Sequence, residues 1–355
     1  MGIGIDTDVK PRDDIHNGVL RQVGISGMGF YVPERAITNQ ELSTMVDTTD
    51  EWIRHHIGIE TRHIAADDQA LSDLAIEAGR KALTAAGLDA SDIDMLIITG
   101  QNHDYKAPAT SCIVQHALGM RKIPAIDLAI GCSGFIYGLA VASKFVADGS
   151  AKHVLLIGAE IHSRMMSWKD RTTCVFFADG AGAVVLSPAA SGYGLLGFDL
   201  GTDGSGSQTI IIPAGGSRTP VTEQALQMLE DDSHQIRAMT HVRMDGKAVF
   251  AFATHIFPAT IRACLDKLGL STKDLDFVIA HQANRNIISE GMKALDLPMD
   301  KTYINLDRYG NCSSASIPIA LTEAVERNLI RRGDLVALVG FGVGLSWGSA
   351  VLRWT

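Results

Sequence analysis

The stretch of this sequence best suited to chemistry is Gly131-Cys-Ser-Gly, which places one nucleophilic side chain between glycines. An apolar run of strand length, residues 125–130, precedes it, and a segment of helical length, residues 135–148, follows at once. Cys132 is therefore expected at a strand-to-helix turn, where unpaired N–H groups and the helix dipole would lower the pKa of the thiol. A small buried hydrophobic cysteine fits the same pattern, so the choice depends on the rest of the chain.

Two polar side chains in the second half of the chain are candidate partners for this cysteine. His281 directly follows an apolar run of strand length, residues 277–280, and Asn311 lies in the turn-rich segment Tyr309-Gly-Asn-Cys-Ser-Ser. Taken alone, the histidine fits a rim or core position, and the asparagine fits a turn or an N-cap. Their meaning depends on whether the fold brings them to Cys132.

The two halves of the sequence repeat one pattern. The segment Asp92-Ile-Asp-Met-Leu-Ile recurs as Asp274-Leu-Asp-Phe-Val-Ile, and the strand-like run 154–158 recurs as 336–340, both at an offset of 182 residues (274 − 92 and 336 − 154). A period of about half the chain predicts two copies of one α/β unit related by a pseudo-twofold axis. Ligand sites in α/β sheets lie at the carboxyl ends of strands, so we expect the turns that carry the cysteine and the asparagine to converge.

The doubling divides the chain into three predicted parts: an N-terminal extension, residues 1–20, a first half, 21–190, with the cysteine, and a second half, 191–355, with the histidine and asparagine. Two glycine-rich stretches, 179–183 and 340–344, resemble fragments of a nucleotide loop, but strand-like sequence follows each where that loop needs a helix. We interpret them as sites of close backbone packing, and the second can also present N–H groups to a substrate oxygen.

Composition narrows the classes of function. The formal net charge is −9, and no basic run alternates with aromatic residues, which argues against binding to nucleic acid. The five cysteines form no C-x-x-C pair, so we expect neither a disulfide framework nor a metal site. Residues 1–17 lack the features of a secretory signal and no run of 18 apolar residues occurs, so the predicted location is the cytoplasm, with no membrane contact.

Several segments together resemble the β-ketoacyl-[acyl-carrier-protein] synthase III family, the condensing enzymes that start fatty-acid synthesis. The resemblance runs from about residue 23 to the C-terminus and rests on Gly131-Cys-Ser-Gly-Phe, Asp179-Gly-Ala-Gly-Ala, His281-Gln-Ala-Asn, Gly310-Asn-Cys-Ser-Ser-Ala and Gly344-Leu-Ser-Trp-Gly-Ser. It implies an α/β, thiolase-like fold, with two pseudo-repeated halves in a five-layered αβαβα architecture, and a homodimer. Related quinolone-forming and resorcinol-forming synthases share the Cys/His/Asn triad, so the resemblance indicates chemistry more closely than pathway.

The resemblance also implies the reaction and the roles of its catalytic residues. Cys132 would attack an acyl-coenzyme A primer to form an acyl-enzyme, with the backbone N–H groups of Cys132 and Val343 as an oxyanion hole. A malonyl thioester of acyl carrier protein or coenzyme A would then lose CO₂ while His281 and Asn311 donate hydrogen bonds to the enolate. The carbanion would attack the acyl group to give a β-ketoacyl thioester. Coenzyme A thioester is thus a substrate, and no permanently bound cofactor is expected.

For the coenzyme A site, the resemblance implies that Trp52 and Arg171 sandwich the adenine, since an aromatic face and a guanidinium plane can both stack on it. It assigns four further residues to the wall of the substrate channel: Thr48, Gly246, Phe250 and Asn284. Each of these residues also fits an ordinary structural role.

Several positions depart from the family pattern. In the predicted acyl pocket Phe177 is kept, but His162 replaces the usual leucine, and Ala107 stands where short-chain enzymes carry a phenylalanine that closes the partner subunit's pocket. The absence of that ring predicts a primer longer or more functionalised than acetyl. His56 stands where the family commonly has an arginine that contacts coenzyme A. Around the mouth, Ala251 and Asn286 occupy positions where basic residues usually meet the acidic carrier protein, with Arg285 and Lys293 nearby. Because these basic residues are missing, we expect weaker charge complementarity to an acidic carrier protein.

Two other functions fit parts of the pattern. A non-condensing acyltransferase on the same fold would pass the acyl group from Cys132 to an alcohol or amine, and release of CO₂ from a malonyl thioester distinguishes a synthase from it. A papain-type cysteine hydrolase has the same order of cysteine, histidine and asparagine, but the surroundings of Cys132 and the internal doubling disfavour it.

Overall fold

The first of two large sheets carries the predicted nucleophile at one of its strand ends. The computed structural model describes residues 20–355, so the predicted N-terminal extension lies almost wholly outside the described residues. In the first sheet the strand order is β1-β7-β6-β4-β5, with β4 parallel to β5 and β6 and with β7 antiparallel to β1 and β6. The strands are β1 (Val23–Tyr31), β4 (Met95–Thr99), β5 (Ala125–Leu128), β6 (Val154–Ile161) and β7 (Asp179–Pro188).

The second sheet repeats this arrangement. Its order is β13-β14-β15-β8, with β13 parallel to β14 and with β15 antiparallel to β14 and β8. A single parallel bridge between Val278 and Thr302 occupies the place that β5 fills in the first sheet. The strands are β8 (Gly194–Thr202), β13 (Phe277–Ala280), β14 (Leu335–Gly342) and β15 (Ser346–Arg353). The predicted pseudo-repeat is thus confirmed by strand order and direction.

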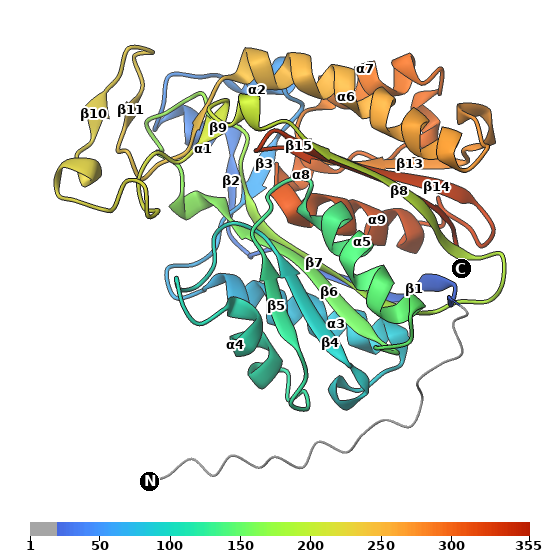
Figure 1. The fold of residues 1–355 in the computed structure, drawn as a ribbon. Coiled ribbons are helices and arrows are strands. Elements are labelled where there is room, and N and C mark those ends of the chain that lie inside the picture. The colour runs from blue at the N-terminus through green and yellow to red at the C-terminus, as the bar shows by residue number, and fades with distance from the viewer. Residues whose placement is uncertain (1–19) are drawn as a thin grey trace, which may run out of the picture.

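Helices cover both sheets and separate them. Helices α3 (Leu71–Ala86) and α4 (Thr110–Ala117) pack on the first sheet, and α6 (Gly246–Lys267) and α7 (Arg285–Ala294) lie over the second. Between the two sheets lie α5 (Gly134–Ala147) and α9 (Ser316–Glu326), each in contact with strands of both (Figure 1). The predicted five-layered αβαβα architecture is confirmed.

Shorter strands and helices complete the fold. They are β2 (Ala36–Thr38), α1 (Asn39–Ser43), α2 (Asp50–His56), β3 (Thr61–His63), β9 (Ile210–Ile211), β10 (Leu229–Glu230), β11 (Ile236–Arg237), β12 (Arg243–Met244) and α8 (Leu306–Tyr309). One-turn 3₁₀ helices are η1 (Ala90–Asp92), η2 (His162–Arg164), η3 (Gly204–Gly206), η4 (Gln224–Leu226), η5 (Thr272–Asp274), η6 (Met299–Lys301) and η7 (Ser313–Ala315). The β10–β11 hairpin projects from the body of the molecule (Figure 1).

The local sequence accounts for the best-defined elements. In α3, apolar residues at helical spacing, among them Leu71, Leu74 and Ala78, are buried, and Gly87 ends the helix with a φ of 64°. Strand β6 is buried at every position, as expected for a strand covered by helices on both faces. Gly87 therefore sets the C-terminal end of α3, and the uniform burial of β6 agrees with its central place in the first sheet.

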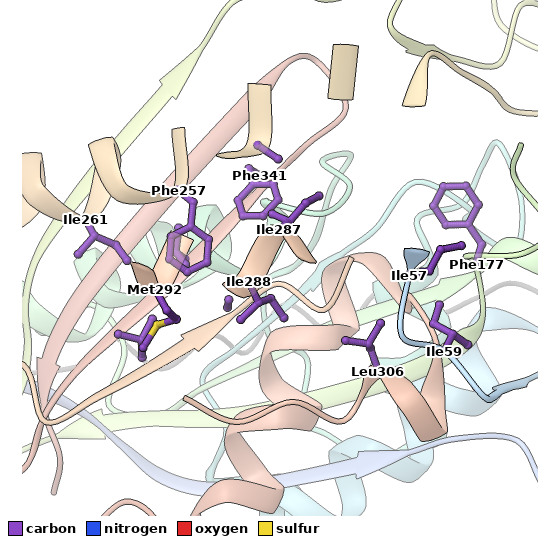
Figure 2. Packing of buried hydrophobic residues seen from close by; sticks show 14 of the residues in the cluster. Ile57, Ile59, Phe177, Phe257, Ile261, Ile287, Ile288, Met292, Leu306 and Phe341 are labelled. Carbon is purple, nitrogen blue, oxygen red and sulfur yellow. The ribbon is translucent and has the colours of Figure 1, made fainter. Parts of the chain in front are cut away.

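A hydrophobic cluster between the second sheet and its outer helices reaches the edge of the cavity. The ring of Phe257 on α6 lies 6.0 Å from that of Phe341 on β14, and Ile287 of α7 is buried in the same cluster (Figure 2). Phe177 belongs to this cluster as well. The core therefore extends without a break to residues that line the functional site, and it fixes their side chains.

Helix α6 is, within residues 20–355, the helix whose length and composition would allow it to cross a membrane. Its side chains Phe257, Ile261 and Cys264 are buried, and the helix packs on β8, β14 and β15. In this fold it is the outer cover of the second sheet.

Candidate active site

Cys132 lies in the turn between β5 and α5, as predicted. Cys132 is 9% exposed, and a hydrogen bond of 2.7 Å joins the hydroxyl of the adjacent Ser133 to that of Ser346. Ser346 also donates to the carbonyl of Val343 at 2.7 Å. The nucleophile of the first half is thereby tied to the glycine-rich turn after β14 in the second half.

The pKa of Cys132 differs from the prediction. Burial, with a smaller contribution from Glu160, raises the pKa of the thiol to about 11, although hydrogen bonds from Ser313 and two backbone N–H groups lower it. The predicted lowering is wrong because loss of hydration outweighs the favourable backbone dipoles. The resting side chain is therefore a neutral thiol that needs a proton acceptor.

Two backbone N–H groups that were predicted to form an oxyanion hole point at the sulfur of Cys132. The backbone N–H groups of Cys132 and Val343 both donate to the Cys132 sulfur. A thioester carbonyl attacked by this sulfur would place its oxygen beside the same two donors. Gly342 makes this approach possible, because a Cβ there would lie 2.8 Å from Cys132 Cβ and 2.9 Å from Sγ.

Substitution Gly342→Ala is expected to slow acylation of Cys132 by roughly 10²-fold, because a displacement of about 1 Å at a reacting group can cost that much. Rapid quenching followed by intact-protein mass spectrometry measures the rate. Gly216→Ala is the matched control, since its new Cβ would meet nothing within 4 Å. An unchanged acylation rate in Gly342→Ala would contradict this account of the turn.

His281 directly follows β13, and it is buried, with 1% of its surface exposed. Its Nδ1 lies 2.6 Å from the Ser316 hydroxyl, and its ring packs edge-on against Phe341. Burial, with a smaller contribution from His162, lowers the pKa of His281 to about 3. The imidazole is therefore neutral at physiological pH, and Nε2 is the ring nitrogen left for the cavity.

Asn311 is fixed by the first half of the chain. Its N–H donates to Phe176 O at 2.9 Å, and its carbonyl accepts from Ala178 N–H at 3.0 Å, next to Gly310 with a φ of 70°. The carboxamide Oδ1 accepts the Ser313 N–H at 2.9 Å. Because the oxygen is used in this way, the NH₂ group is the part available to donate to a substrate.

The ion pair between α8 and α9 supports this segment. Arg308 donates to both carboxylate oxygens of Glu323 at 2.8 Å, and Asn305 adds a third bond at 2.8 Å. Burial alone would raise the pKa of Glu323, but these bonds outweigh it and hold the pKa below its usual value. The charged pair anchors α8, which leads directly into Gly310 and Asn311.

Cys132, His281 and Asn311 line one partly enclosed cavity of about 120 Å³. Gly342, Val343 and the phenylalanines at positions 177 and 341 line the same cavity. The structure therefore brings a sulfur from the first half and an imidazole and a carboxamide from the second half to one small volume, as the doubled sequence predicts.

The predicted acyl-pocket residues are only partly assembled in the single chain. His162 and Phe177 line the cavity, and their rings stack at 4.7 Å with an angle of 7°. Burial lowers the pKa of His162 to about 4. Ala107 is exposed and does not line the cavity. The prediction placed Ala107 at the partner subunit's pocket, so its role stays a prediction.

An outer cleft of about 960 Å³ holds most of the predicted coenzyme A residues: Thr48, Trp52, Arg171, Gly246 and Phe250. It shares Phe176, Met244, Gly246 and Phe250 with the inner cavity, so the two spaces adjoin. His56 stacks on the Trp52 ring at 4.6 Å, and Arg171 pairs with the exposed Asp47 at 3.1 Å.

Asn284 lines the inner cavity instead, and its carboxamide has structural partners. Oδ1 accepts from Asn286 N–H at 2.7 Å and so caps α7, while Nδ2 donates to His56 O at 3.0 Å. These bonds attach the start of α7 in the second half to the end of α2 in the first half.

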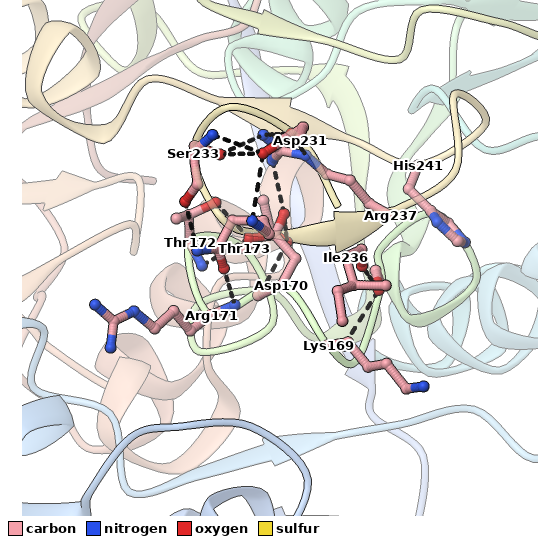
Figure 3. Close-up of polar contacts among 12 residues, drawn as sticks. Lys169, Asp170, Arg171, Thr172, Thr173, Asp231, Ser233, Ile236, Arg237 and His241 are labelled. Carbon is pink, nitrogen blue, oxygen red and sulfur yellow. Dashed lines mark hydrogen bonds and ion pairs between the residues drawn. The ribbon is translucent and has the colours of Figure 1, made fainter. Parts of the chain in front are cut away.

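A buried polar cluster fixes the loop that carries Arg171. Arg237 of β11 pairs with Asp170 at 2.8 Å and donates to Asp231 at 2.7 Å (Figure 3). Gln235 accepts the Arg171 N–H at 3.0 Å. Because Asp170 and Arg237 are both buried and hydrogen-bonded, the hairpin is firmly attached to the rim of the outer cleft.

Sequence reasoning missed three polar residues near the catalytic ones: Ser313, which contacts Cys132, Ser316, which contacts His281, and Glu160, which contacts Ser313. Glu160 could have been noticed as a single acidic residue in an otherwise apolar strand, Val-Leu-Leu-Ile-Gly-Ala-Glu-Ile. Ser313 and Ser316 carry no such signal, because serine is common in turns and at helix starts.

Comparison with known proteins agrees with this geometry. Residues 126–204 match the family model of 3-oxoacyl-[acyl-carrier-protein (ACP)] synthase III, and residues 265–354 match that of its C-terminal part. A β-ketoacyl-[acyl-carrier-protein] synthase III from Caldanaerobacter subterraneus subsp. tengcongensis is 48% identical over 332 residues, which are 94% of this chain and 98% of that protein.

Solved structures share the whole fold. The 3-oxoacyl-[acyl-carrier-protein] synthase III of Aquifex aeolicus aligns with a TM-score of 0.84 at 36% identity, covering 94% of this chain and 100% of that one. A priming β-ketosynthase from a polyketide biosynthetic pathway aligns with a TM-score of 0.85 at 30% identity, covering 96% and 99%.

Proposed function

Because the chain belongs to the β-ketoacyl-[acyl-carrier-protein] synthase III family, we propose a role for each residue of its cavity in the condensation that this family catalyses. The enzyme joins an acyl primer to a malonyl thioester with loss of CO₂ and forms a β-ketoacyl thioester. Membership of this family excludes the papain-type hydrolase. The observation that carries the assignment of roles is the convergence of Cys132, His281 and Asn311 on one cavity.

In the first half-reaction, the Cys132 sulfur attacks the primer's thioester carbonyl. The N–H groups of Cys132 and Val343 stabilise the tetrahedral oxyanion, and collapse of this intermediate expels the coenzyme A thiolate. Each backbone donor is already in place before the substrate arrives, so little reorganisation is needed.

In the second half-reaction, Asn311 Nδ2 and His281 Nε2 donate to the malonyl carbonyl as CO₂ leaves and charge moves onto that oxygen. The Ser316 hydroxyl donates its one proton to the Ser313 carbonyl at 2.8 Å, and His281 Nδ1 lies 2.6 Å from the same hydroxyl. In the proposed donor state this proton turns to Nδ1, so that the ring proton sits on Nε2. A neutral imidazole stabilises the enolate without quenching the carbanion. The carbanion then attacks the acyl carbonyl on Cys132.

The outer cleft is the proposed binding site for acyl-coenzyme A. The adenine would lie between the free face of Trp52 and the Arg171 guanidinium, and the pantetheine arm would pass Thr48, Gly246 and Phe250 toward Cys132. Asn284 would contribute to the inner wall. Coenzyme A is in this scheme a substrate carrier that leaves after the first half-reaction.

A second thioester on acyl carrier protein is the proposed malonyl donor. Lys247 at the rim of the outer cleft and the exposed Arg285 and Lys293 of α7 offer positive charge to an acidic carrier protein, while Ala251 and Asn286 offer none. We further propose a homodimer in the cytoplasm. In that dimer Ala107 would face the partner's acyl pocket.

The primer preference tests this part of the proposal. Turnover is expected to be higher with octanoyl-coenzyme A or benzoyl-coenzyme A than with acetyl-coenzyme A, because Ala107 leaves room that a phenylalanine would fill. Initial rates with equal concentrations of the three thioesters measure it. Ala107→Phe should shift the preference toward acetyl by about tenfold, the size expected for a few methylene groups in an apolar pocket. Strict use of acetyl by the unchanged enzyme would contradict the proposal.

A further inference from the structure

Glu160 is a buried carboxyl group that the reaction scheme above does not use. It lies in β6 with no exposed surface, its Oε1 accepts the N–H of Gln101 at 3.1 Å, and the N–H of Asn102 also lowers the pKa of the carboxyl. Its Oε2 has no hydrogen-bond partner among residues 20–355. An unpaired oxygen is costly for a buried carboxylate and less so for a neutral acid, so this site favours a carboxyl that can hold a proton.

Ser313 connects this carboxyl to the nucleophile. Its hydroxyl lies 3.3 Å from Glu160 Oε1 and 3.5 Å from Cys132 Sγ, and it is within donating geometry of both. Ser313 has a φ of 49°, a left-handed conformation that non-glycine residues adopt rarely and that clusters at functional sites. The fold therefore holds a strained residue where its hydroxyl bridges a thiol and a carboxyl.

We propose that Glu160 accepts the thiol proton of Cys132 through the hydroxyl of Ser313 when the enzyme is acylated. The S–H proton passes to Ser313 Oγ as the Ser313 proton passes to Glu160 Oε1, while sulfur forms its bond to the acyl carbon. The bond between that carbon and the coenzyme A sulfur breaks, and the thiolate that leaves takes a proton from solvent. Glu160 is then neutral for as long as Cys132 carries the acyl group.

Condensation reverses the transfer. When the carbanion attacks the acyl carbon, the bond to Cys132 breaks and sulfur leaves as a thiolate. Glu160 returns its proton through Ser313, which restores the thiol and the carboxylate. Storing the proton also removes a negative charge from the neighbourhood of the cavity while the malonyl carboxylate and the developing enolate occupy it. The pair formed by Cys132 and Glu160 thus carries one negative charge in the free enzyme and none in the acyl-enzyme.

The groups around Glu160 give it a pKa that suits a proton acceptor. Burial raises the pKa of Glu160 to about 8, against the effect of its backbone hydrogen bonds, and the nearby Asp179 acts in the same direction as burial. Within residues 20–355, Glu160 also interacts with the thiols of Cys132 and Cys312, and burial raises the pKa of both, so both are neutral proton donors. A base with a pKa close to the working pH accepts a proton far more readily than His281, with its pKa of about 3.

Glu160→Gln tests the proposal, since the amide oxygen can still accept from Gln101 and Asn102. Acylation is measured in single turnovers by rapid quench and intact-protein mass spectrometry from pH 6 to pH 10. Acetyl-coenzyme A or octanoyl-coenzyme A serves as the probe, whichever acylates the wild type faster. The wild-type rate should rise with pH and level off above about pH 8. At pH 7.5 the variant should be about 10²-fold slower, as expected for loss of a general base, with no plateau near pH 8.

Fast acylation of the Glu160→Gln variant would contradict a role of Glu160 as proton acceptor. Glu160 raises the pKa of Cys132, so if it acts only through its charge, Glu160→Gln would acylate as fast as wild type or faster, which would overturn the proposal. Ser313→Ala should show the same slow acylation, and the double variant should be no slower than the slower single variant. Ser314→Ala is the matched control: its hydroxyl bonds Thr99 and not Cys132, so it should keep the wild-type pH profile.

Discussion

Cys132→Ala is expected to form no acyl-enzyme, while decarboxylation of a malonyl thioester continues at a measurable rate. The variant lacks the sulfur that accepts the acyl group, but His281 and Asn311 still line the cavity as donors for the enolate. Incubation with acyl-coenzyme A followed by mass spectrometry measures the adduct, and release of labelled CO₂ measures decarboxylation.

Cys264→Ala is the matched control, because this buried thiol of α6 lies outside the residues that line the cavity. It should acylate at the wild-type rate. An acyl adduct on Cys132→Ala would move the nucleophile to another residue, and loss of decarboxylation in the same variant would mean that the two half-reactions do not have the separate donor sets assigned here.

Asn311→Ala is expected to slow decarboxylation by roughly 10²- to 10³-fold, the usual effect of removing one oxyanion donor, and to slow acylation of Cys132 by less than about tenfold. The reason is that in the proposed mechanism the Asn311 NH₂ group donates to the malonyl carbonyl, whereas backbone N–H groups would hold the oxyanion of acylation. Asn311→Asp should slow decarboxylation further, because it places a carboxylate where negative charge develops.

Both half-reactions need to be measured on the same preparation of Asn311→Ala, because the change also removes the acceptor for the Ser313 N–H. The acylation rate then reports any general disturbance of the loop. Equal losses in the two half-reactions would contradict a specific role for the carboxamide in enolate stabilisation.

The sequence predicted the framework of the site because strong local patterns determine it. Residues 277–280 form a strand with the predicted bounds, and His281 follows it directly. The 182-residue offset predicted two equivalent sheets, and from them the convergence of Cys132 with Asn311. Periodicity and turn chemistry are properties of neighbouring residues, so they can be recognised without knowledge of the tertiary structure.

The electrostatics of the site was not predictable in the same way. The strand-to-helix turn at Cys132 correctly suggested converging N–H groups, but the pKa of the thiol is raised because the depth of burial depends on both halves of the chain. Ser313 and Glu160 are 153 residues apart in sequence and meet only in the folded molecule. Ala107 is exposed and lies outside the cavity of the single chain, so its proposed role follows from the proposed homodimer.

The most direct test of the central claim is one single-turnover experiment on the acyl-enzyme. Enzyme acylated by a labelled primer is isolated, the labelled residue is identified by peptide mapping, and malonyl-acyl carrier protein carrying a labelled free carboxyl group is added. We predict that the label resides on Cys132 and that one CO₂ is released for each acyl group that leaves the enzyme as a β-ketoacyl thioester. A label on another residue, or loss of the acyl group without CO₂ release, would contradict the single site formed by Cys132, His281 and Asn311.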